Sequence, residues 1–251
     1  LHDALPICRI ILTEFDLSSA SQATLGALAP IGKSVHIDAS EQVGGLHFTK
    51  DIPLADFVNP TTLPNMTLAD TGNLYDFEFT VYVNGDATGA KIAHGEALNQ
   101  TIDLTSGITA IPNTGELSLS VVGTFDATAT KTTINSGEQF QVTATWTDPD
   151  NATKKVALDP STQVLMEITQ GSSHLTDLGA GLYQGGTDGS AKIKVTVPQT
   201  GTPLDSKTIN ITISNKTLKV PKFNTLDSLH MQQKMNLALG SSECLSLNCR
   251  Y

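Results

Sequence analysis

The chain has 251 residues and a net charge of −10, and charged residues make up only 16% of it. Because an acidic surface repels phosphate groups, and no basic patch interleaved with aromatic residues occurs, we expect no nucleic-acid partner, and anionic membrane surfaces are disfavoured for the same reason. Thr and Ser together number 52, which suits strands with hydroxyls on their outer faces and disfavours long helical bundles. The length favours two domains over one.

The N-terminal residues differ in character from the rest of the chain. The stretch Leu1-His2-Asp3-Ala4-Leu5-Pro6-Ile7 resembles the in-frame translation of a sequencing adapter. We therefore predict that residues 1–8 are an artefact, and the absence of a signal peptide there says nothing about secretion. No stretch of the chain approaches the roughly 18 apolar residues that a membrane helix needs.

Residues 9–125 predict an acidic β-sandwich, with thirteen Asp and Glu against four Lys and Arg. In chain order we expect a short helix at Ser18–Leu28, capped by Ser18 or Ser19 and ended before Pro30. The alternation of apolar and polar residues predicts strands and one long loop. The strands are expected at Ser34–Ser40, Gly45–Lys50, Asp76–Val83, Leu98–Leu104 and Glu116–Gly123, and the loop at Asn59–Asn73.

Two of these strands carry a prediction about side-chain direction. In Asp76–Val83 the apolar residues point to a core and Asp76, Glu78, Thr80 and Tyr82 to water. Asn84-Gly85-Asp86 then predicts a tight hairpin into the segment Ala87–His94. In Glu116–Gly123 we expect Leu117, Leu119 and Val121 to point inward.

Residues 126–217 predict a second sandwich of nearly neutral charge. In Gln139–Thr147 the residues Phe140, Val142, Ala144 and Trp146 alternate with polar ones, and Asp148-Pro149-Asp150-Asn151 then predicts a turn. The same inward pattern returns at Val164, Met166 and Ile168, at Ile193, Val195 and Val197, and at Ile209, Ile211 and Ile213. Strands at this spacing are typical of a sandwich.

Two segments of the second half resemble a bacterial Ig-like domain of the invasin and intimin type. They are Ile134–Asp148, which contains Ser136-Gly137 and Val142-Thr143-Ala144-Thr145, and Thr187–Val195, which contains Thr187-Asp188-Gly189. The resemblance covers about residues 125–214 and implies an Ig-like sandwich from a bacterial surface protein. Trp146 departs from the smaller apolar residue that is usual at its position, and the antibody-type cysteine pair is absent.

Several groups of residues are candidate binding sites. Gly26 to Ser34 resembles a phosphate-binding loop, but five residues separate Gly26 from Gly32 where four are required, and a strand pattern follows. His36 and His47 would face each other if their strands pair around Glu41–Gly44, with Asp38 as a third metal ligand. The alternative is two solvated histidines on a strand exterior, which the missing ligand spacing favours.

Asp148 and Asp150 flank Pro149 at a loop apex, where a calcium ion is one interpretation and turn chemistry the other. The full calcium loop with its alternating acids is missing, which favours the turn. Trp146 would be a sugar platform if it faced outward, but its parity with Phe140 and Val142 predicts burial. The paired acids Asp76 and Glu78 are expected to be solubility charges.

No catalytic motif occurs: there is no G-x-S-x-G elbow, and the three cysteines, Cys8, Cys244 and Cys249, all lie at the ends. The tail 218–251 is either native, with a helix at Ser228–Leu239, or a second artefact. We therefore predict an all-β, non-enzymatic fragment of a bacterial cell-surface or secreted modular protein, without cofactor or metal, whose tandem sandwiches display a surface to an unknown protein or glycan. The alternatives are a phage or virion structural protein and an accessory glycan-binding module.

Overall fold

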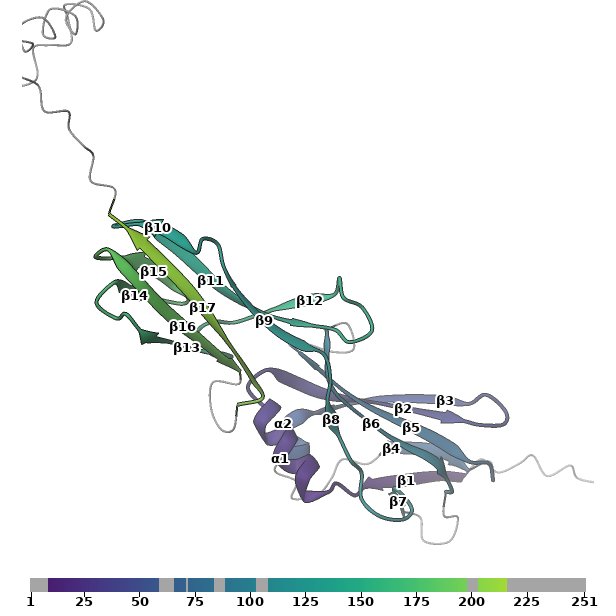
Figure 1. Ribbon diagram of the computed structural model, residues 1–251. Coiled ribbons are helices and arrows are strands. Elements are labelled where there is room, and N and C mark those ends of the chain that lie inside the picture. The colour runs from purple at the N-terminus through teal and green to yellow at the C-terminus, as the bar shows by residue number, and fades with distance from the viewer. Residues whose placement is uncertain are drawn as a thin grey trace, which may run out of the picture. The chain divides into compact units, whose positions relative to one another are not determined.

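Strands dominate the computed structural model, which describes residues 9–58, 66–70, 72–83, 89–102, 108–197 and 203–215 (Figure 1). Within these residues there are seventeen strands and two helices, which confirms the predicted all-β class. The described residues all belong to one compact unit. The artefact predicted at residues 1–8 and the helix predicted at Ser228–Leu239 lie outside the described residues, as do all three cysteines.

Residues 9–121 build the first sandwich from two sheets, here called the N-terminal sandwich. The smaller sheet has the order β4-β1-β7 and the larger one the order β3-β2-β5-β6-β8. Phe15 on β1 packs edge-on against Phe79 on β5, with 5.2 Å between the ring centroids, so the two sheets face each other across an aromatic core. The strands are β1 (Arg9–Phe15), β2 (Gly32–Glu41), β3 (His47–Pro53), β4 (Met66–Asp70), β5 (Tyr75–Val83), β6 (Lys91–Gln100), β7 (Ile108–Ile111) and β8 (Ser120–Val121).

Strand β5 forms as predicted on its inner face and differs on its outer face. Phe77, Phe79, Val81 and Val83 are fully buried. Thr80 and Tyr82, however, are buried as well, whereas the sequence placed that whole face in water. At Tyr82 the expectation was wrong because Lys154, far along the chain, lies over the ring. The Thr80 hydroxyl instead lies 3.3 Å from His94 Nδ1 on the neighbouring strand.

The predicted helix is confirmed as α1 (Ser19–Leu28), and Ser18 caps it by accepting a hydrogen bond from the Ser21 amide. The Ser21 hydroxyl donates to the Leu117 carbonyl and accepts from the Leu119 amide, which ties the helix to the end of the sandwich. A second short helix, α2 (Leu54–Val58), contacts α1 and was not predicted. Its five residues are too few to show a helical period.

Several boundaries in this half differ from the sequence prediction. The expected loop Asn59–Asn73 contains β4, and the strand predicted at Leu98–Leu104 is instead the end of β6, which stops at Gln100. Val121, expected to point inward, is exposed. The β5–β6 pairing is antiparallel as the hairpin predicts, but its turn, residues 84–88, lies outside the described residues.

Residues 124–214 build the second sandwich, called the C-terminal sandwich. One sheet has the order β10-β17-β16-β13; the other has the order β12-β11-β15-β14, with β9 also paired to β11. The inward residues predicted for β11, β16 and β17 are all buried, whereas Met166 and Ile168 of β13 are only partly so. The strands are β9 (Thr124–Ala129), β10 (Thr133–Asn135), β11 (Gln139–Thr147), β12 (Lys155–Leu158), β13 (Leu165–Gln170), β14 (Leu175–Gly179), β15 (Leu182–Gly185), β16 (Gly189–Val197) and β17 (Asp205–Ser214).

Two strand pairings are parallel in an otherwise antiparallel fold: β1 with β7, and β10 with β17. Parallel strands need a long connection between them, and both pairs have one. Hairpin signals in the sequence indicate only antiparallel neighbours, so they do not predict these two pairings. The buried apolar residues of both sandwiches form one continuous cluster. The boundary predicted at residue 125 stays a prediction, because residues 1–215 form a single unit.

Tyr183 on β15 supplies a test of the C-terminal core at high pH. It is fully buried and stacks on Phe140, and its hydroxyl has no hydrogen-bond partner among the described residues. Burial, with a smaller contribution from the Asp177 carboxylate, raises the pKa of Tyr183 to about 12. Since a tyrosine in the unfolded chain titrates near pH ~10, the stabilisation linked to this group is present below that pH. We expect it to be lost as the pH rises from about 10 to about 12.

The matched control is Tyr183→Phe, which removes the titrating hydroxyl and keeps the ring. We expect this variant to lose that part of the alkaline decline and, at pH 7, to be at least as stable as the parent, because an unpaired buried hydroxyl costs about 1 kcal/mol or more. Urea unfolding followed by circular dichroism between pH 7 and pH 11.5 measures both effects. Parallel stability curves for parent and variant would contradict the assignment.

Candidate functional site

The two histidines weighed as metal ligands lie on the outer face of the larger N-terminal sheet, but they are not opposite each other. His36 pairs in register with Asp51, and His47 pairs with Ser40. Each histidine contacts a carboxylate instead: His36 Nδ1 lies 2.9 Å from Asp51 Oδ1, and His47 Nε2 lies 2.5 Å from Asp38 Oδ1. Asp38 therefore contacts His47 and the Ser40 hydroxyl, whereas His36 contacts Asp51, and the structure does not assemble the three predicted ligands.

A third pair of this kind, His94 with Glu96 on β6, was not singled out from the sequence. His94 Nε2 lies 3.1 Å from Glu96 Oε1, and its Nδ1 lies 3.3 Å from the Thr80 hydroxyl. A hydroxyl, an imidazole and a carboxylate in a row resemble the parts of a nucleophilic triad. Thr80 is buried, however, so its hydroxyl is not open to a substrate.

The histidines have a plain electrostatic explanation. Asp38, Glu78 and Glu96 stand directly opposite one another on β2, β5 and β6. Like charges at opposed positions destabilise a sheet, and His47 and His94 each place a hydrogen-bonding partner beside one member of this row. Asp76 is also engaged, because it accepts hydrogen bonds from the Gln42 side chain and the Asn99 amide. Among the described residues, no group of three or more His, Cys, Asp or Glu side chains is arranged to hold a metal ion.

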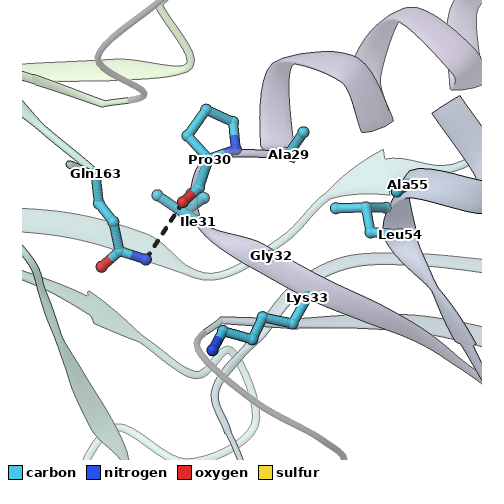
Figure 2. Close-up of a pocket in the computed structure, with 8 residues that line it drawn as sticks. All are labelled: Ala29, Pro30, Ile31, Gly32, Lys33, Leu54, Ala55 and Gln163. Carbon is cyan, nitrogen blue, oxygen red and sulfur yellow. Dashed lines mark hydrogen bonds between the residues drawn. The ribbon is translucent and has the colours of Figure 1, made fainter.

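The segment that resembles a phosphate-binding loop takes a different shape. Helix α1 ends at Leu28, and Gly32 and Lys33 open strand β2, so no helix begins after the glycine and no amide cluster faces a phosphate. The segment instead forms one wall of a groove of about 510 Å³, together with α2 and Gln163 (Figure 2). A second hollow of about 540 Å³ shares Pro30, Lys33 and Gln163 with it and continues along β12 to Pro160.

Gln163 bridges the two sandwiches at this groove. Its Nε2 donates to the Pro30 carbonyl at 3.4 Å, as the dashed line in Figure 2 shows, and its Oε1 accepts from the Asp159 amide at 2.7 Å. Gln163 is buried, so we assign it a structural part rather than a ligand-binding one. Lys33 is exposed beside it and forms no ion pair with another described residue.

The residues weighed as a calcium site lie at a second contact between the sandwiches. Asp148 Oδ2 accepts a hydrogen bond from the Lys91 amide at 3.0 Å, and its Oδ1 accepts from the Asp150 amide at 3.0 Å. Asp150 Oδ2 pairs with Lys91 Nζ at 2.7 Å. The turn predicted here is confirmed by the Asp150 amide bond, and both carboxylates are engaged by nitrogen donors.

Trp146 is 2% exposed, which confirms the predicted burial and removes it as a sugar platform. Its indole Nε1 donates to the Lys91 carbonyl at 3.1 Å. Sequence reasoning missed Lys91, Tyr82 and Lys154 as members of this contact. Lys91 opens a strand, but no residue close to it in the sequence indicates a partner more than fifty residues away.

Three exposed apolar side chains lie at the opposite end of the larger N-terminal sheet. Val43 is 67% exposed and Leu46 is 40% exposed at the tip of the β2–β3 hairpin, and Leu98 at the end of β6 is 50% exposed. In register, β2 meets Tyr75 at this end and Val83 at the other, so the tip and the Tyr82–Lys91 contact lie at opposite ends of β5. We call residues 42–46 with Leu98 the apolar tip.

The apolar tip is held by a hydrogen-bond network. The buried Glu41 carboxylate accepts from the Leu46 amide at 3.3 Å and from Asn73 Nδ2 at 2.6 Å. The Gln42 side chain donates to Asp76 and to Asn99, whose backbone has a φ of 57°. Asparagine adopts this left-handed conformation more readily than other residues with a side chain, which suits Asn99 to the end of the strand.

Comparison with known proteins adds little beyond this description. No protein-family model and no curated protein matches the chain. Among solved structures, the D00-D0 domain of intimin aligns with 81% of this chain and 84% of its own, at 14% sequence identity and a TM-score of 0.24. At that TM-score the alignment supports no argument, so the fold assignment rests on the strands themselves. Among the described residues, no helix is long and apolar enough to cross a membrane.

Proposed function

We propose that this chain is a non-enzymatic segment of a bacterial cell-surface or secreted modular protein, and that it presents the apolar tip to a protein partner. The observation that carries the proposal is the tip itself: exposed Val43, Leu46 and Leu98 on a network anchored by buried Glu41. A prearranged apolar surface loses little conformational entropy on binding. The sequence resemblance of residues 125–214 to a bacterial Ig-like domain supports the surface setting.

A protein partner is favoured over a glycan by the placement of the aromatic residues. Glycan-binding surfaces stack sugars on exposed rings, and the candidate ring, Trp146, is buried. In the part of the chain that the structure describes, every Phe, Tyr and Trp side chain with an assigned burial is buried or half-buried. The exposed apolar residues are aliphatic.

The test immobilises the full chain on beads and measures retention of purified extracellular-matrix proteins and purified polysaccharides. We expect a protein of the panel to be retained and the polysaccharides to pass through. The double variant Val43→Ser/Leu46→Ser is expected to weaken retention at least about tenfold, because truncating central apolar contacts costs more than 1 kcal/mol.

The matched control is Leu178→Ser, which replaces an equally exposed leucine on β14 of the C-terminal sandwich. It is expected to leave retention unchanged. The proposal fails if the control loses as much binding as the tip variant, if a polysaccharide is the molecule retained, or if the full chain turns over ester, peptide or glycoside substrates.

A further inference from the structure

Both polar groups of the Lys91 backbone are held by side chains of the C-terminal sandwich. The amide donates to Asp148 and the carbonyl accepts from Trp146, at 3.0 Å and 3.1 Å. Trp146 and Asp148 stand two residues apart at the end of β11, and both are buried. Together they hydrogen-bond to both the amide and the carbonyl of one residue of β6, as the backbone of a neighbouring strand would.

The charges at this contact are balanced by protein groups alone. Asp148 is 5% exposed, and Lys154 Nζ lies 3.9 Å from its Oδ2, in addition to the two amides that it binds. Burial by itself would raise the pKa of Asp148, but the Lys91 and Asp150 amides and the two lysines outweigh it and hold that pKa below its usual value. The carboxylate is therefore charged at neutral pH. The hydrogen bond from Lys91 to Asp150 raises the pKa of Lys91, so this group is charged as well.

The connection between the sandwiches passes through the same contact. Gly123 has a φ of 85°, and a Cβ atom placed on it would lie 2.5 Å from Trp146 Nε1 and 2.6 Å from the Thr147 carbonyl. Both distances are shorter than a side chain can tolerate. Any residue other than glycine would push the indole away from Lys91. The Gln163–Pro30 hydrogen bond then supplies a second, separate point of attachment.

We propose that Asp148 locks the two sandwiches into one rigid body at neutral pH without a bound cation. The Lys91 and Asp150 amides and the Lys154 ammonium group surround this carboxylate where a calcium ion would otherwise bind, and the Lys91 ammonium group does the same for Asp150. The chain therefore holds the apolar tip at a fixed distance from the C-terminal sandwich whatever the calcium concentration. This inference is independent of what the tip binds.

The experiment measures ¹⁵N relaxation on the full chain and compares the rotational correlation times of amides in the two sandwiches. In the parent protein we expect both sandwiches to tumble with the same correlation time, in 5 mM calcium chloride and in excess EDTA alike. Asp148→Asn replaces one of the two acceptor oxygens with an NH₂ group, so one of the two backbone amides loses its acceptor. In this variant we expect the correlation times to fall toward that of a single sandwich. Asp177→Asn, an exposed acid on β14, is the control and stays coupled.

Gly123→Ala tests the same lock from the other side, because it displaces the indole and leaves the carboxylate intact. We expect it to uncouple the sandwiches while circular dichroism shows the strand content unchanged. Loss of coupling in the parent on adding EDTA overturns the inference. So does coupled tumbling in a folded Asp148→Asn protein or, if that variant does not fold, in Gly123→Ala.

Discussion

Replacing Trp146 with alanine is expected to lower the free energy of unfolding by about 3–5 kcal/mol, the range for removing a large aromatic side chain from a packed core. Trp146 is among the largest fully buried side chains of the described residues, and its loss also leaves the Lys91 carbonyl without the indole donor. Urea unfolding followed by far-ultraviolet circular dichroism measures the change. Fluorescence is unsuitable because Trp146 is the only tryptophan in the chain.

The matched variant Trp146→Phe separates packing from hydrogen bonding. It keeps most of the buried apolar volume and removes the N–H donor, so we expect a loss of about 1 kcal/mol from the hydrogen bond plus a smaller loss from the reduced ring. A Trp146→Ala protein within 1 kcal/mol of the parent would show that the indole is not a core residue, and that the contact with Lys91 contributes nothing to stability.

Phe79→Ala is expected to cost about 3–5 kcal/mol in the N-terminal sandwich. Phe79 is fully buried, with its ring centroid 5.2 Å from that of Phe15 and 6.3 Å from that of Phe77. Since Phe15 belongs to the other sheet, the substitution opens a cavity where the two sheets meet. Chemical unfolding of the full chain measures the loss.

Phe48→Ala is the control for Phe79→Ala, because it removes the same ring from the edge strand β3. Phe48 is only half-buried and lies 6.4 Å from Tyr75, so less apolar surface returns to water and neighbouring residues can close the gap. We expect roughly 1–2 kcal/mol here, in proportion to the smaller buried area. Equal losses for the two variants would place the core of this sandwich elsewhere.

The sequence was sufficient to predict strand bounds and burial wherever one face of a strand is buried and the other is exposed to solvent. Strand β11 begins and ends at the predicted residues, and Phe140, Val142 and Trp146 are buried as their parity requires. Helix α1 was predictable for a similar reason, since a capping serine and a following proline mark its ends locally. These features depend only on residues close together in the chain.

The errors fall where distant residues cover or pair with a segment. Strands β1 and β7 pair in parallel, and the partner of each lies far away in sequence, so no hairpin signal marks them. Thr80 and Tyr82 were placed in water because the alternation of β5 is clear, yet Lys154 lies over the Tyr82 ring and His94 contacts Thr80. The burial of a polar residue depends on side chains that are distant in sequence, and the alternation of apolar and polar residues carries no information about them.

For the candidate sites, too, the sequence indicated the residue types, and the fold decided which residues they contact. The residue types at Asp148 and Asp150 allowed either a turn or a calcium ion from the sequence, and only the folded chain brings Lys91 and Lys154 to the two carboxylates. His36 and His47 share a face, as their strands predicted, but the register sets each against its own carboxylate. A shift of two residues in that pairing would bring different side chains together without changing any local pattern.

The sequence by itself determined that this is an all-β protein with an acidic first half, that the alternating apolar residues of β5 and β11 are buried, and that no G-x-S-x-G motif is present. Tertiary structure alone decided that Trp146 and Asp148 hydrogen-bond to the Lys91 backbone, and that Val43, Leu46 and Leu98 are exposed at one end of the larger N-terminal sheet. The physical reason is range: side-chain direction follows from the backbone geometry of each strand, whereas these contacts join residues that only strand order and register bring together.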